Sequence, residues 1–207
     1  MLVELDSYMK RTLIAAVLLA GLLATQAQER MSREETLQVA FYTCLDLKAM
    51  LATPIPTDPD VKRPVAVKDG DFGGMVLPES KLSADTFANA GTEAKSVGQL
   101  WLRGLAPMNA GQVVPADKLR TVHVQAMGQE ADAVCCALGV CKNTDGGLEL
   151  ALFGKDKEPV TRVALKPISG QQENPIEVSA ERKDDSGVLT VKFLGKYEAT
   201  FSVTAPD

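Results

Sequence analysis

Hydrophobic and polar residues alternate along most of the chain after Val65. In such a run every second side chain points to the same face of a strand, so the alternation predicts strands with one buried and one solvent-facing side. The clearest runs cover residues 120–125, 148–152, 176–181, 189–193 and 197–203. Segments rich in Gly, Asn, Asp and Pro separate them and favour tight turns. The pattern therefore predicts a mainly β protein, either an antiparallel β-sandwich or an open barrel.

The first part of the chain has a helical period instead. Ser32 and Glu35 have the spacing of a capping box, in which each side chain satisfies a backbone N–H group of the first turn. The apolar residues that make one stripe at helical spacing are Leu37, Ala40, Phe41, Cys44 and Leu45. We expect a helix over residues 33–51, followed by an extended, proline-rich connector at 54–59, where a helix cannot continue. A shorter helix is expected within residues 80–95, before a strand over 97–102.

A third pattern, a continuous apolar run, lies further upstream. Lys10 and Arg11 precede the run over residues 13–23, and residues 25–27 place small side chains where a signal peptidase reads them. The run is too short for a membrane-spanning helix, which needs about 20 residues, so a permanent anchor is the less favoured alternative. We expect a signal peptide at 9–27, with translation starting at Met9 and cleavage after Ala27. The expected organisation is a signal peptide at 1–27, a helix and connector at 28–64, and a β-sandwich domain at 65–207.

Length and charge narrow the range of partners. Removing 27 of the 207 residues leaves 207 − 27 = 180, which fits one domain of ordinary size. The net charge of -5 argues against nucleic acid and against anionic lipid surfaces, both of which favour a basic face. The mature chain contains no second apolar stretch long enough to span a membrane. We therefore expect a periplasmic or secreted protein.

The four cysteines are the unusual chemical feature of the sequence. Cys44 lies on the expected helix, and Cys135, Cys136 and Cys141 cluster within one segment. Exported proteins commonly oxidise such residues to disulfides. On one straight strand Cys135 and Cys141 would lie about 20 Å apart, and adjacent cysteines would point to opposite faces. We therefore expect a disulfide between Cys44 and one member of the cluster. The alternative is a thiol or metal site in the cluster, although the spacing lacks the paired cysteines of structural zinc sites.

Two further residues are candidates for a ligand surface. His123 is the only histidine and falls on the polar face of its strand. Trp101, the only tryptophan, lies in an apolar segment, so it becomes a ligand candidate if it is exposed and a core residue if it is not. Neither residue belongs to a recognisable Ser-His-Asp set.

These observations predict a non-catalytic, exported β-sandwich protein that binds an unknown protein or a small ligand and needs no cofactor. The rival function is a thiol-redox or metal-binding protein built on Cys135, Cys136 and Cys141. An exported hydrolase is a third possibility, and it would require a pocket that gathers His123 and carboxylates.

Overall fold

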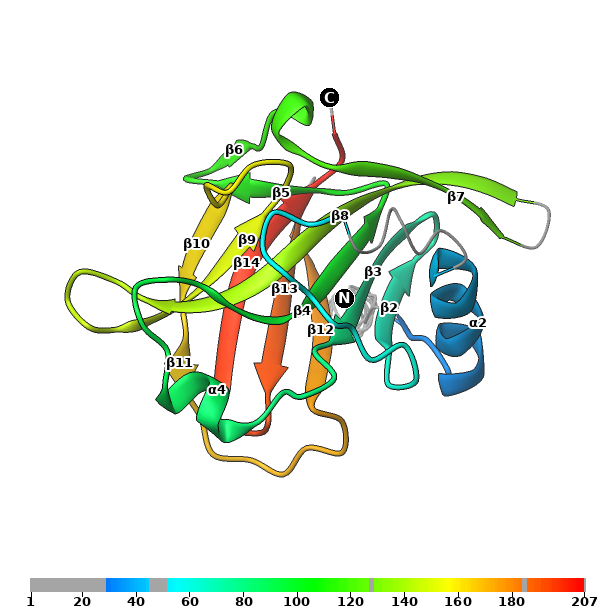
Figure 1. The fold of residues 1–207 in the computed structure, drawn as a ribbon. Helices are drawn as coiled ribbons and strands as arrows, with labels where there is room; N and C mark the ends of the chain where they lie inside the picture. The colour runs from blue at the N-terminus through cyan, green and yellow to red at the C-terminus, as the bar shows by residue number, and fades with distance from the viewer. Residues whose placement is uncertain (1–28, 45–51, 127–128, 184–185, 207) are drawn as a thin grey trace, which may run out of the picture.

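The computed structural model describes residues 29–44, 52–126, 129–183 and 186–206 of the chain (Figure 1). The expected signal peptide at 9–27, its start at Met9 and residues 45–51 of the expected helix lie outside these ranges. They therefore remain predictions from the sequence.

Two antiparallel sheets form the body of the described structure. The first sheet has eight strands, which are β1 (Glu29–Arg30), β2 (Val65–Asp69), β3 (Phe72–Pro78), β4 (Lys95–Arg103), β7 (Thr121–Ala126), β8 (Gln129–Lys142), β9 (Leu148–Phe153) and β10 (Thr161–Ala164). The second has six, which are β5 (Ala106–Asn109), β6 (Gln112–Val113), β11 (Lys166–Pro167), β12 (Ile176–Lys183), β13 (Ser186–Phe193) and β14 (Tyr197–Thr204). The mainly β prediction is confirmed, and the two open sheets are consistent with a β-sandwich.

The strand order places the hairpin β7–β8 in the first sheet and the hairpin β12–β13 in the second sheet. The order is β1-β2-β3-β4-β8-β9-β10 in the first sheet, with β7 beside the first half of β8. In the second sheet it is β12-β13-β14-β5-β6, with β11 beside β14. The expected helix within 80–95 is the short α4 (Ala84–Ala88), and a 3-10 turn covers Ala116–Lys118.

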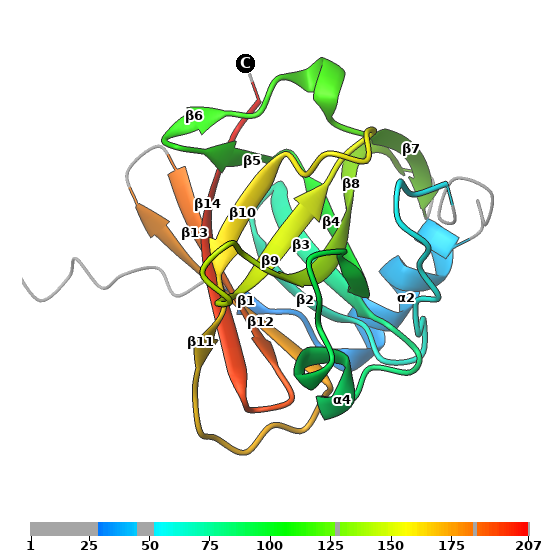
Figure 2. The same ribbon diagram turned by 60° about the vertical axis from the view of Figure 1, so that its left-hand side comes forward.

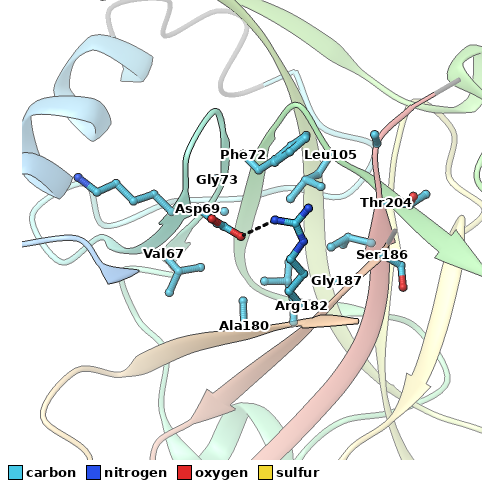
Figure 3. A pocket seen from close by; sticks show the side chains of 15 residues that line it. Val67, Asp69, Phe72, Gly73, Leu105, Ala180, Arg182, Ser186, Gly187 and Thr204 are labelled. Carbon is cyan, nitrogen blue, oxygen red and sulfur yellow. Dashed lines mark ion pairs between the residues drawn. The ribbon is translucent and has the colours of Figure 1, made fainter. Parts of the chain in front are cut away.

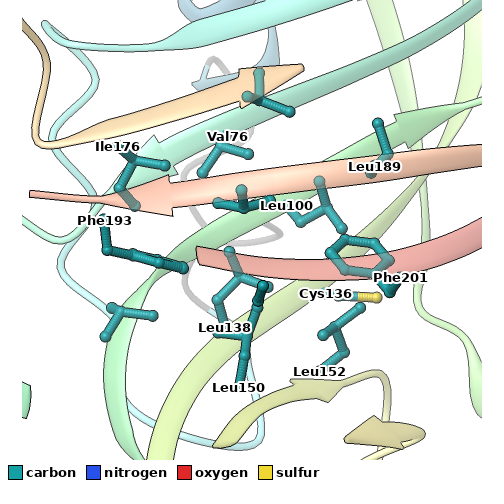
Figure 4. Close-up of a cluster of buried hydrophobic side chains, with 14 of the residues drawn as sticks. Val76, Leu100, Cys136, Leu138, Leu150, Leu152, Ile176, Leu189, Phe193 and Phe201 are labelled. Carbon is teal, nitrogen blue, oxygen red and sulfur yellow. The ribbon is translucent and has the colours of Figure 1, made fainter. Parts of the chain in front are cut away.

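The main core fills the space between the inner faces of the two sheets (Figure 4). Alternation decides which side chains enter it, because every second residue of each strand points inward. On β8 the inward set is Cys136, Leu138 and Val140, all completely buried. The opposite sheet contributes Ile176, Leu189, Val191, Phe193 and Phe201.

The N-terminal helix α2 (Arg33–Cys44) lies on the outer face of the first sheet, away from the second sheet (Figure 2). Its capping box is formed: the backbone N of Ser32 donates to Glu35 Oε2 at 3.0 Å, and the backbone N of Glu35 donates to Ser32 Oγ at 3.2 Å. The predicted start of the helix is therefore confirmed.

The predicted apolar stripe matches the packed face of α2 only in part: Ala40 is buried and Leu37 is half-buried, but Phe41 is not buried. The buried residues are Thr36, Ala40 and Thr43, whereas Phe41 is 63% exposed. Both threonine hydroxyls donate to the carbonyl four residues earlier, at 2.8 Å each, so they can be buried without unpaired polar atoms. Small side chains with internally satisfied hydroxyls bring this helix close to the sheet, and the larger apolar residues Leu37 and Phe41 face a shallow hollow beside Val61.

The connector after α2 also lies against the first sheet. The backbone N of Asp58 donates to Glu79 Oε1 at 2.6 Å, and Gln99 Nε2 donates to Thr57 Oγ1 at 2.8 Å. These contacts cover the outer face around Trp101. In the part of the chain that the structure describes, no helix is long and apolar enough to cross a membrane.

The two sides of the sandwich differ. On one side the chain passes directly from β10 in the first sheet to β11 in the second, and β10 contacts β14. On the other side β2 and β12 contact each other, but no hydrogen-bonded ladder joins them among the described strands. The first sheet ends on this side in the two-residue β1, which pairs with β2, and the second sheet ends in β12, so this side is an open seam.

Candidate functional site

The described part of the structure shows no disulfide at the three cysteines of β8, the expected partners of Cys44. Cys135, Cys136 and Cys141 are all free thiols and all buried, while the side chain of Cys44, the last residue of α2, lies outside the described part of the structure. The reason is packing on β8, which runs as one continuous strand. Cys136 points into the main core, and Cys135 and Cys141 occupy two separate outer clusters.

The environment of Cys135 and Cys136 keeps these two thiols protonated. Burial raises the pKa of Cys135 to about 12, although the nearby Arg120 guanidinium, whose Nη1 lies 3.4 Å from Cys135 Sγ, acts in the opposite direction. Burial also raises the pKa of Cys136. Because the thiolate is the nucleophile and the metal ligand, both shifts oppose reactivity. Across the described residues, no group of three or more His, Cys, Asp or Glu side chains is placed to hold a metal ion.

The other two candidates from the sequence, Trp101 and His123, have different environments. Trp101 is only 3% exposed and its Nε1 donates to Gln99 Oε1 at 3.1 Å, so it is a core residue beneath α2 and the connector. His123 is on the surface of β7, where its Nδ1 lies 3.0 Å from Asp132 Oδ1. This hydrogen bond raises the pKa of His123, with a smaller contribution from the charge of Glu130.

A cavity lies at the open seam between the two sheets (Figure 3). It has a volume of about 310 Å³ and is bounded by β2 and β3 on one side and by β12, β13 and β14 on the other. Its apolar walls are formed by Val67, Phe72, Leu105, Leu189 and Val203. We call this cavity the seam cleft. A volume of this size equals the liquid volume of about ten water molecules, so it suits a ligand of about ten non-hydrogen atoms.

Glycines create the space of the seam cleft. Gly73 and Gly74 on β3 and Gly187 on β13 all line it. A Cβ atom at Gly74 would contact Leu102 Cδ2 at 3.6 Å and Leu189 Cδ1 at 3.7 Å, in the space between the two sheets. The two sheets are therefore kept from full contact at this end by the absence of side chains.

An ion pair stands at the mouth of the seam cleft. Asp69 follows Val65 and Val67 on the inward-facing side of β2, and Arg182 has the corresponding position at the end of β12. Arg182 Nη1 lies 3.7 Å from Asp69 Oδ2 (Figure 3). Two charged residues thus occupy inward positions where each strand would otherwise present apolar side chains.

No family model matches the chain, and no curated protein and no solved structure is significantly similar to it. Any function must therefore be argued from the geometry of the molecule itself.

The sequence did not reveal the seam cleft. A local signal existed, because Asp69 and Arg182 each continue an inward-facing series of apolar residues with a charge. That signal becomes meaningful only when β2 and β12, which are more than a hundred residues apart in the chain, are known to be neighbours. Alternation predicts the face of a side chain but not the partner of its strand.

Proposed function

We propose that this chain is an exported, non-catalytic β-sandwich protein that binds a small, largely apolar ligand in the seam cleft. The observation that carries the proposal is the cleft itself: an apolar cavity of about 310 Å³ at a sheet edge, with one ion pair at its mouth. Apolar cavities with a few polar groups at defined positions are the usual form of ligand sites. Export rests on the sequence of residues 9–27.

The non-catalytic part of the proposal rests on what lines the cleft. The single histidine of the sequence, His123, is on β7 and does not line it. Asp69 and Arg182 offset each other's charge, and the hydroxyl of Ser186 donates to the backbone carbonyl of Lys183 at 3.0 Å. These groups suit recognition better than general base catalysis, which needs a basic group within reach of a nucleophile.

The buried cysteines weigh against the rival thiol-redox or metal-binding function. A reactive cysteine is exposed and has a lowered pKa. Cys135 has the opposite properties, being buried with a pKa of about 12.

The experiment is a titration of isotope-labelled protein with 1-octanol, an uncharged ligand of suitable size, followed by NMR. For about ten atoms and an ordinary ligand efficiency, the Kd should be on the order of 0.1–1 mM. We expect shifts concentrated at Val67, Gly74 and Leu189.

Two variants of one strand make the titration specific. Ala180 lines the cleft from the inward side of β12, and Ser179 is its exposed neighbour on the opposite face. Ala180→Leu should abolish the octanol-induced shifts and Ser179→Leu should leave them unchanged. Shifts that are dispersed over the surface, or that survive in Ala180→Leu, would contradict the proposal.

A further inference from the structure

Arg182 is the polar group of the seam cleft that an incoming ligand meets first. Its side chain is 59% exposed, whereas that of its partner Asp69 is 26% exposed. Figure 3 shows the guanidinium standing over the cavity from β12, between Asp69 and Leu105. The accessible charge at the mouth is therefore positive.

The Asp69–Arg182 pair leaves donor capacity on Arg182. The separation of 3.7 Å between Nη1 and Oδ2 exceeds the length of a direct charge-assisted hydrogen bond, which is about 2.7–2.9 Å. A guanidinium has five N–H donors in a planar fork that matches a carboxylate in a two-point arrangement. Arg182 can thus accept a second anion more readily than Asp69, which lies deeper, can accept a second cation.

Among the described residues, two other basic side chains near the mouth already have carboxylate partners. Lys68 precedes Asp69, but its Nζ lies 3.3 Å from Glu35 Oε1 on the outer side of the sheet. Arg103 and Asp71 form their own pair at 3.5 Å beyond the cleft residues. Lys68 also lines the cleft, but with its Nζ beside Glu35, Arg182 is the described basic group best placed at the mouth to meet an anion.

We propose that the ligand of the seam cleft is a small amphiphile with a hydrocarbon chain and a terminal carboxylate. The chain occupies the apolar cavity between the sheets, and the carboxylate binds the Arg182 guanidinium in competition with Asp69. This inference rests on the proposed function, because it specifies the chemical class of the ligand in the same cleft.

The experiment compares octanoate with 1-octanol, which share a chain length and differ in the charge of the head group. Binding is measured by NMR titration at low ionic strength, because salt weakens the attraction between exposed charges. The wild-type protein should bind octanoate about five- to tenfold more tightly than octanol, which is the scale of a partly exposed charge-assisted hydrogen bond.

Three variants test the role of Arg182. Arg182→Gln should remove the preference for octanoate and leave octanol affinity within about twofold. Asp69→Asn should increase octanoate affinity by about two- to fivefold, since the competing carboxylate is gone. Arg103→Gln is the matched control, because Arg103 is also an exposed arginine paired with an aspartate, at 3.5 Å, but does not line the cleft. It should change neither affinity.

The results separate this inference from the proposed function. If octanol binds as tightly as octanoate to the wild type, or if Arg103→Gln reduces octanoate binding as much as Arg182→Gln does, the carboxylate class is wrong while the apolar cleft stands. If neither compound binds in the cleft, the proposed function fails and the inference fails with it. A preference for octanoate that only Arg182→Gln removes supports both.

Discussion

Two glycines on neighbouring strands should respond in opposite directions to the addition of one methyl group. Gly74 lies on β3 at the floor of the seam cleft, where a Cβ would be 3.6 Å from Leu102 Cδ2 and 3.7 Å from Leu189 Cδ1. Both distances are ordinary van der Waals contacts. Burying a methyl group contributes about 0.8 kcal/mol to the free energy of unfolding. Replacing glycine lowers the conformational entropy of the unfolded chain, which contributes about 0.4–1 kcal/mol more. Gly74→Ala should therefore stabilise the protein by about 1–2 kcal/mol.

Gly98 on β4 provides the contrasting variant. It lies at a bulge in the pairing of β4 with β8, has φ of 150°, and a Cβ there would overlap the carbonyl oxygen of Leu77. The backbone of β3 must move to admit it, because a carbonyl in a ladder cannot rotate away as a flexible side chain can. Gly98→Ala should destabilise the protein by about 2–4 kcal/mol, from overlap and backbone strain together.

The assay is equilibrium unfolding in urea, followed by circular dichroism, with the free energy of unfolding extrapolated to water. The slope with denaturant should not change in Gly74→Ala, so that the shift in midpoint reports stability alone. The midpoint of thermal unfolding should rise by about 2–7 °C for Gly74→Ala. The reasoning is refuted if Gly74→Ala is destabilising by more than about 0.5 kcal/mol, or if Gly98→Ala unfolds at the same urea concentration as the wild type.

Three further predictions concern the surface and the core. NMR titration should give His123 a pKa above its ordinary value, and Asp132→Asn should bring the pKa back towards that value. Because the pKa is raised in the folded state, the stabilisation from the His123–Asp132 pair is present at acidic pH. It is lost as the pH rises through the folded-state pKa. A histidine pKa that is unaffected by Asp132→Asn would show that the hydrogen bond is not its cause. The three cysteines of β8 should be unreactive towards a thiol reagent in the folded protein and should all react after unfolding in denaturant. Rapid native labelling of any of these three, located by peptide mass spectrometry to separate them from Cys44, would contradict their burial. Phe41→Ser should change the free energy of unfolding by less than about 0.5 kcal/mol, while Phe193→Ala, which empties a fully buried site, should cost about 3–5 kcal/mol; equal losses would place Phe41 in a buried contact.

Local patterns predicted the elements of this fold well. The alternating run at 176–181 is β12 (Ile176–Lys183), and the run at 197–203 is β14 (Tyr197–Thr204). The capping box at Ser32 marked the start of α2 because its hydrogen bonds join residues three apart in the chain. The geometric argument that Cys135 and Cys141 cannot meet also holds, since β8 continues through both residues without a reversal.

The errors arose where packing depends on distant residues. Hydrophobicity alone selected Leu37 and Phe41 for the packed face of α2, but the sheet surface there accommodates Thr36 and Thr43, whose hydroxyls bond within the helix. The disulfide was inferred from the expected compartment and from the spacing of the cysteines, neither of which shows whether two side chains meet. Cys136 illustrates the difficulty, because it faces the core between the sheets rather than the helix.

The Gly74→Ala variant also tests whether the seam cleft is a binding site or only a packing defect. A ligand that binds only the folded state adds about 1.4 kcal/mol of stability at ten times its Kd. If octanoate occupies the seam cleft, it should raise the unfolding free energy of the wild type by this amount and that of Gly74→Ala by much less, because the added Cβ lies in the space that the chain would fill. Saturating ligand should therefore narrow the stability difference between the two proteins. If the cleft is only a packing defect, octanoate should leave that difference unchanged, and Gly74→Ala should keep its full advantage at every ligand concentration.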